Sequence, residues 1–198
     1  LYGGLKEVLD EEGILFISDE VQTGWGRTGE HFWGYQAHGI TPDLLTFAKG
    51  LGNGLAIAGV VGRGDIIDAI STNSISTFGG NPLATAGALA NLEYVIEHDL
   101  QTNAYKIGQQ LADGFHRLAD ETPQIGDVRG KGLMIGIELR VAAAPIVEMC
   151  MARGFFINAV QENTIRLIPP LIIGRASIDA FVDCLFEIFE EMEKGKGA

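Results

Sequence analysis

The stretches GILFISDEVQTGWGRTG (Gly13–Gly29) and DLLTFAKGLGNG (Asp43–Gly54) decide the fold. Each holds a short apolar run that ends in one charged residue, Asp19 in the first and Lys49 in the second, followed by a glycine-rich turn. Apolar runs of this length between turn signals are typical of strands buried on both faces of a parallel sheet. Ligands of open α/β sheets bind outside the carboxyl ends of the strands. We therefore expect Asp19 and Lys49 to face one ligand together.

Two phosphate-binding motifs are alternatives for these two glycine-rich turns. The segment GWGRTG (Gly24–Gly29) matches the dinucleotide fingerprint G-x-G-x-x-G, but that site needs a helix directly behind the glycines and an acidic strand end about 20 residues on. Here the chain continues EHFWGYQAHGITPD, with Pro42 and no helical period. A P-loop is also disfavoured, because Lys49 precedes its glycines instead of following them.

The pair of residues suits an aldehyde cofactor better. A lysine can form a Schiff base with pyridoxal phosphate, and an aspartate can pair with the pyridinium nitrogen of the ring. Gly50, Gly52 and Gly54 would let the backbone pass close to such a ring. On residue types alone the simpler alternative stays open, in which Asp19 is a surface acid and Lys49 starts a helix.

Three ordered motifs extend this hypothesis: DEVQTGWGRTG, TPDLLTFAKGLGNG and STFGGNPLATAGALA. Together with RGKGLMIGIEL and TIRLIPPL, they make the chain resemble the class III aminotransferases among the fold-type I pyridoxal-phosphate enzymes along nearly its whole length. The resemblance implies that Asp19 pairs with the pyridine nitrogen, Val21 packs on the ring, Gln22 reaches the ring hydroxyl side and Lys49 carries the Schiff base. The proline that usually follows the KGLGxG turn is missing, which affects the expected loop shape.

The resemblance also implies a shared active site. Thr77 precedes a helix that the residues predict on their own, with Asn81 as N-cap and Pro82 at the first helical position. In isolation Thr77 is an ordinary capping-type residue. In the family the matching threonine reaches the cofactor phosphate of the neighbouring subunit, so a homodimer is expected.

Arg166 is the second candidate for function. It interrupts an apolar run between Ile165 and Leu167. One interpretation is an arginine that faces solvent or a structural carboxylate. The other is a bidentate clamp on a substrate carboxylate, for which the planar guanidinium is suited. The resemblance favours the clamp, because the arginine of the R-x-x-P-x-L pattern holds the substrate α-carboxylate.

Composition limits the partners. The chain has 198 residues, 46% of them hydrophobic, with a net charge of −12 and a pI near 4.6. Such acidity argues against nucleic-acid or anionic-membrane partners, which need basic patches. Two cysteines, no signal peptide and no membrane-length apolar run indicate a cytoplasmic protein. No metal site is expected, since His31 and His38 lack ligand neighbours at suitable spacing.

The expected fold class is α/β. Residues 1–122 are predicted to be the C-terminal part of a large pyridoxal-phosphate domain with a mainly parallel sheet, ending in a connecting helix over 103–119. Residues 123–198 are predicted to be a small α+β domain, with a glycine-framed turn at 127–132 and a frayed tail at 194–198. The chain starts at Leu1 and lacks the phosphate-cradling loop of longer family members. We therefore expect the C-terminal part of an aminotransferase.

The predicted activity is transfer of an amino group from an amino acid or ω-amino donor to a 2-oxo acid. The first two thirds resemble alanine–glyoxylate or ω-amino-acid enzymes, whereas GFFINAVQENTIRLIPPLII resembles acetylornithine aminotransferases, so the donor (alanine, 4-aminobutyrate or N-acetylornithine type) stays open. Two alternatives are another pyridoxal-phosphate reaction, such as an aminomutase or a racemase, and a non-catalytic fragment.

Overall fold

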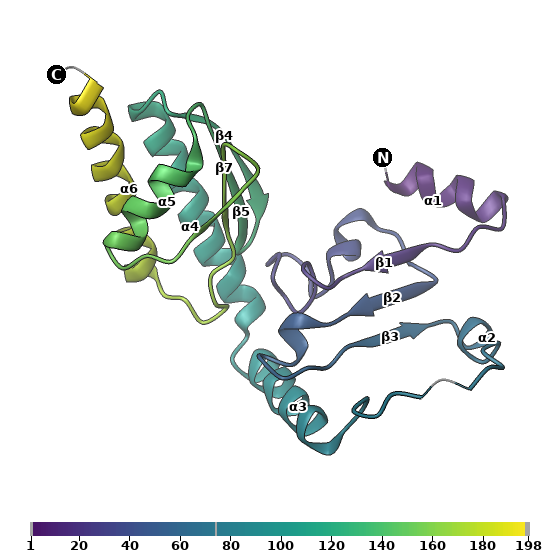
Figure 1. Cartoon of the computed structure of the whole chain (residues 1–198). Helices are drawn as coiled ribbons and strands as arrows, with labels where there is room; N and C mark the ends of the chain where they lie inside the picture. Colours follow the sequence, from purple (N-terminus) through teal and green to yellow (C-terminus); the bar gives the residue numbers. More distant parts are fainter. Residues whose placement is uncertain (1, 74, 197–198) are drawn as a thin grey trace. The chain divides into compact units, whose positions relative to one another are not determined.

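The computed structural model describes residues 2–73 and 75–196. Leu1, Ser74 and the last two residues of the tail expected to fray lie outside the described residues. The chain forms two compact units, Leu1–Gln101 and Thr102–Ala198 (Figure 1). The division falls about 20 residues before the predicted boundary at 122/123, and the difference is the connecting helix, whose apolar face belongs to the core of the second unit. The assignment of these units as domains of an enzyme stays a prediction.

The first unit is built on a three-stranded sheet with the strand order β1-β2-β3 (Figure 1). Strands β1 and β2 are parallel, as the sequence predicted, whereas β3 runs antiparallel to β2. The described part of this sheet is therefore mixed. The elements are α1 (Tyr2–Glu11), β1 (Ile17–Asp19), η1 (Gly34–His38), β2 (Leu44–Phe47), η2 (Lys49–Leu51), β3 (Gly59–Gly62), α2 (Gly64–Ile67) and α3 (Pro82–Glu97).

The strands of this sheet are less buried than their composition predicted. Ile17 of β1 is 54% exposed and Val61 of β3 is 58% exposed, while Leu45 of β2 is buried. The expectation of strands buried on both faces is therefore wrong for β1 in this chain. The physical reason is that β1 and β3 are edge strands, each paired with β2 alone in this sheet.

A buried carboxylate joins the amino ends of β1 and β2 to the carboxyl end of β3. Asp43, directly before β2, accepts hydrogen bonds from the backbone N–H of Phe16 (2.8 Å) and from Nη1 of Arg63 (2.9 Å). These bonds lower the pKa of Asp43 below its ordinary value, with the Phe16 bond as the largest cause. One side chain thus joins the chain entering β1 to the residue that leaves β3.

The second unit has an antiparallel sheet with the order β4-β5-β7-β6. Its elements are α4 (Leu100–Glu121), β4 (Ile125–Lys131), β5 (Met134–Leu139), α5 (Ala143–Ala152), β6 (Asn158–Val160), β7 (Thr164–Leu167) and α6 (Arg175–Lys196). Helix α4 begins two residues before this unit, which starts at Thr102. The glycine-framed turn predicted at 127–132 is wrong. Residues 127–131 pair with β5 as a strand, because Gly130, at φ 152°, is tolerated in an extended ladder.

The core of the second unit lies between one face of the sheet and the three helices (Figure 1). Alternate residues of β5 are buried, so its other face carries the half-buried Gly136 and Glu138. Cys150 of α5 and Cys184 of α6 are both free and buried in this core. Desolvation is the main reason that the pKa of Cys150 rises to about 12, which supports a packing role for its thiol. Within the described residues, no helix is long and apolar enough to cross a membrane.

Candidate active site

Strand pairing sets the relation between Asp19 and Lys49. Asp19, the last residue of β1, stands opposite Thr46 of the parallel strand β2, and Lys49 follows Thr46 by three residues. Both charged residues therefore leave the sheet at the carboxyl ends of neighbouring strands, where α/β folds bind ligands. This is the arrangement that the two apolar runs predicted.

The Asp19 carboxylate is exposed and held on one side only. Its Oδ1 accepts hydrogen bonds from the backbone N–H of Val21 (3.1 Å) and the hydroxyl of Thr46 (3.4 Å). Its Oδ2 has no partner in the part of the chain that the structure describes, so one oxygen stays free for a ligand. Val21 is half-buried and Gln22 exposed in the turn that follows.

Lys49 has an unusual backbone. Its φ is 40°, in the left-handed region that residues with a Cβ seldom occupy. Such strain of about 1–3 kcal/mol is typical of functional sites and persists only where neighbours enforce it. The two residues after Lys49 are held by Asn91 of α3, whose amide donates to the carbonyls of Gly50 (2.8 Å) and Leu51 (3.1 Å). Asn91 was not predicted from the sequence as a contact of this turn, although a polar residue inside an alanine-rich helix can indicate such a contact.

Close packing explains a glycine beyond Lys49. A Cβ on Gly52 would lie 2.0 Å from the carbonyl oxygen of Leu55, so no larger residue fits there. Leu55, in the segment 55–57 that lacks the family's proline, reaches Gly87 of α3, where a Cβ would meet its side chain at 2.3 Å. The turn after Lys49 therefore packs closely on α3.

The aromatic loop between β1 and β2 packs on itself. Trp25 forms ring contacts with Phe32, Trp33 and Phe47 at centroid distances of 4.7–5.8 Å.

Sequence reasoning also missed Glu20, which is 1% exposed at the base of this loop. Its position directly after Asp19 could have indicated this burial, because neighbouring side chains along a strand point to opposite sides of the sheet.

Thr77 is exposed and lies before α3. No hydrogen bond of the described residues joins it to Asp19, Val21, Gln22 or Lys49. Hydrogen bonding within the described residues therefore does not link Thr77 to the other predicted cofactor residues. Three residues nearby are strongly exposed and apolar: Ile75 (92%), Phe78 (80%) and Leu83 (73%).

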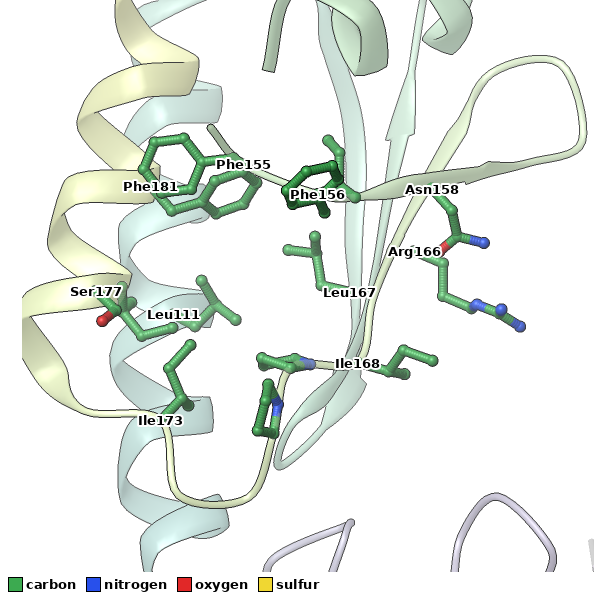
Figure 2. A pocket seen from close by; sticks show the side chains of 14 residues that line it. Leu111, Phe155, Phe156, Asn158, Arg166, Leu167, Ile168, Ile173, Ser177 and Phe181 are labelled. Carbon is green, nitrogen blue, oxygen red and sulfur yellow. The ribbon is translucent and has the colours of Figure 1, made fainter. Parts of the chain in front are cut away.

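Arg166 lies on β7 of the second unit, opposite Gly136 of β5 and Asn158 of β6. Its flanking residues Ile165 and Leu167 are buried in the core, so Arg166 is on the other face of the sheet. Figure 2 shows the side chains of Arg166 and Asn158 next to each other and directed away from the apolar part of a cavity of about 450 Å³.

The Arg166 guanidinium is only partly paired. When the Asn158 amide is turned so that its oxygen faces the guanidinium, it accepts from Nη2 (3.3 Å) and its nitrogen donates to the Arg166 carbonyl (3.1 Å). Nε of Arg166 is closed off from solvent and has no acceptor among the described residues. A buried donor without a partner is costly, and Nε lacks an acceptor that the described residues do not supply.

Comparison with known proteins gives the class to which this fold and site belong. The family model for class-III aminotransferases matches residues 1–189. Acetylornithine aminotransferase of Methanocaldococcus jannaschii is 39% identical over 191 residues, covering 96% of this chain and 48% of that protein. The mitochondrial alanine–glyoxylate aminotransferase 2 of Homo sapiens is 39% identical over 199 residues, covering 91% of this chain and 39% of that protein.

A solved structure agrees with these relatives. The acetylornithine aminotransferase of Elizabethkingia anophelis superposes with a TM-score of 0.88 at 33% identity, over 94% of this chain and 48% of that one. The chain belongs to the class-III aminotransferase family, as its motifs predicted, and pyridoxal phosphate is the cofactor of that family. The chain spans about half the length, or less, of the relatives it matches.

Proposed function

We propose that this chain carries the lysine, the ring-nitrogen partner and the substrate arginine of a pyridoxal-phosphate-dependent aminotransferase. The observation that carries the proposal is the parallel pairing of β1 and β2, from which Asp19 and Lys49 emerge at the same edge of one sheet. The match of the family model over residues 1–189 supports the same function.

The residues present fit the cofactor. Asp19 offers a free carboxylate oxygen, which would accept a hydrogen bond from the ring nitrogen and keep it protonated. The exposed amine of Lys49 would bond the aldehyde carbon. Val21 and Gln22, in the turn after Asp19, would contact the ring and its hydroxyl side. When bound, pyridoxal phosphate supplies an electron sink for negative charge at the substrate Cα.

Each residue then has one task in the reaction. Lys49, when released by the amino donor, would hold and move the proton at the substrate Cα as a general acid and base. Arg166 would bind the substrate carboxylate through its planar guanidinium. Asp19 would stay hydrogen-bonded to the ring nitrogen throughout.

The substrates proposed are an amino acid or ω-amino donor and a 2-oxo acid. The relatives reported above act on acetylornithine or on alanine and glyoxylate by their names, so both donor types suggested by the motifs remain candidates. Net amino transfer distinguishes this activity from an aminomutase or a racemase, which leave no 2-oxo acid converted to an amino acid.

We also propose a homodimer, and a cytoplasmic setting as the composition predicted. The exposed apolar residues around Thr77 support an interface there, because exposed apolar patches mark interaction sites. Thr77 would then serve the cofactor phosphate of the partner, as the resemblance to the family implies.

The direct test is trapping of the cofactor. The purified chain is mixed with pyridoxal phosphate and reduced with borohydride, and the modified lysine is identified by peptide mass spectrometry. We expect one adduct at Lys49, lost in Lys49→Ala and kept in Lys106→Ala, which removes an exposed helix lysine. Equal labelling of many lysines, unchanged in Lys49→Ala, would favour the non-catalytic fragment.

A further inference from the structure

Glu20 is a buried carboxylate of the first unit that accepts four hydrogen bonds. Its Oε1 accepts from the hydroxyl of Ser18 (3.0 Å) and the backbone N–H of Tyr35 (2.7 Å). Its Oε2 accepts from the hydroxyl of Thr23 (2.5 Å) and the backbone N–H of Gly34 (2.7 Å). The side chain is 1% exposed, and each of its two oxygens accepts two hydrogen bonds.

These hydrogen bonds connect the end of β1 with separate segments of the loop between β1 and β2. Three of the donors, on Ser18, Thr23 and Gly34, come from segments up to 16 residues apart in the sequence. The backbone of Glu20 is also fixed, since its N–H donates to Thr46 of β2 (2.9 Å) and its carbonyl accepts from Gly24 (3.0 Å). The turn that carries Asp19, Val21 and Gln22 is therefore held at both ends by one residue.

Packing around Glu20 gives independent support. A Cβ on Gly34 would lie 2.7 Å from the Thr23 Cβ and 3.1 Å from the Glu20 Oε2. A Cβ on Gly24 would lie 2.6 Å from the Trp33 ring and 2.9 Å from the Glu20 carbonyl oxygen. Both glycines are thus required by the close approach of chain segments to Glu20.

We propose that Glu20 is a positioning residue, whose buried carboxylate holds the turn Asp19–Gln22 against the backbone of Gly34 and Tyr35 and so directs the Asp19 carboxylate. This inference rests on the proposed role of Asp19 as the partner of the ring nitrogen. Asp19 and Glu20 are adjacent acids with different tasks, the exposed one for the ligand and the buried one for the loop.

The test compares Glu20→Gln with Asp43→Asn in the whole chain. The amide introduced by Glu20→Gln presents its NH₂ group to two donors whichever way it turns, so two of the four hydrogen bonds are lost. Asp43 is a matched control, because it is also a buried carboxylate of this sheet but lies at the other end of β2, away from Asp19.

Three readouts are expected to change in Glu20→Gln and not in Asp43→Asn. Exchange of the Val21 amide hydrogen, which is bonded to Asp19, should be about 10-fold faster, the equivalent of one lost hydrogen bond. The near-UV circular dichroism of Trp25 and Trp33, the two tryptophans of the chain, should weaken. Borohydride-trapped cofactor at Lys49 should fall about 10-fold at limiting pyridoxal phosphate.

Equal Val21 exchange and equal circular dichroism in the two variants would overturn the positioning role. Absence of trapping at Lys49 in the unmodified chain would instead overturn the proposed function, while the exchange data still decide the role of Glu20. If Glu20→Gln does not fold, Gly34→Ala provides the second variant, because its added methyl presses on Oε2 and Thr23 and should speed Val21 exchange in the same direction.

Discussion

At the residue scale, Asp43 ties the stability of the first unit to pH. Its pKa is lowered in the folded chain by the Phe16 and Arg63 hydrogen bonds, so folding favours the charged form. The resulting stability is present above the ordinary carboxyl pKa of about 3.9 and is lost as the pH falls through the lower folded-state value. We expect urea midpoints of the first unit to fall steeply below about pH 4.

The variant Asp43→Asn should remove this part of the acid limb. It should be less stable than the unmodified chain at neutral pH and should converge with it as the pH falls below the folded-state pKa of Asp43. The fluorescence of Trp25 and Trp33 reports on this unit. If the free energy of unfolding falls equally with decreasing pH in the two proteins, the pH dependence comes from other carboxylates.

Arg166 allows a second prediction, which concerns substrate binding in an active preparation. Replacement by Lys keeps the charge but loses the bidentate geometry, at a cost of about 1.5–3 kcal/mol, or roughly 10–100-fold in KM for the acid substrate. Asn158→Ala should give a smaller change in the same direction, because Arg166 then loses its cross-strand partner. An unchanged KM in Arg166→Lys would indicate that Arg166 serves the sheet and not the substrate.

At the element scale, the start of α3 depends on Asn81. Its Oδ1 caps the helix by accepting from the N–H of Ala84 (2.9 Å), and its amide donates to the carbonyl of Phe78 (2.8 Å). Asn81→Ala should cost about 1 kcal/mol in free energy of unfolding. Asn81→Asp keeps the capping acceptor and loses only the Phe78 bond, so it should recover most of the stability in urea unfolding of the first unit. Equal losses in both variants would mean that the Phe78 bond, not the cap, dominates.

Helix α3 and strand β4 show which features of the fold could be predicted from the sequence. The Asn81-Pro82 start was visible because capping is local chemistry, read from adjacent residues. The strand at Ile125–Lys131 was not, because its glycines match a turn and only pairing with β5 makes it extended. Likewise, the strand ends predicted that Asp19 and Lys49 lie at the same edge of the sheet. The hydrogen-bond partners of Glu20 could not be predicted, since Gly34 and Tyr35 come from a loop without periodicity.

At the scale of the whole molecule, the two units differ in how completely they bury apolar surface. The core of the second unit joins α4, α5, α6 and the sheet, whereas the first unit has a small cluster around Trp25 and exposed strands. Apolar spacing predicted the helix over 103–119 but not the unit to which this helix belongs, because an amphipathic face does not specify the element against which it packs. In the structure, Leu111, Phe115 and Leu118 pack into the second core.

This difference predicts unequal local stability. Local opening is easiest where few buried contacts must break, so amide hydrogens of β5 and β7 should exchange about 100-fold more slowly than those of β1 and β3. Leu185→Ala should cost about 2–5 kcal/mol and should speed exchange only in the second unit, because it opens a cavity in that core. Ile17→Ala, at a half-exposed position of β1, should change little. Equal protection of the two sheets, or a Leu185→Ala effect that spreads to β1, would mean that the units unfold as one.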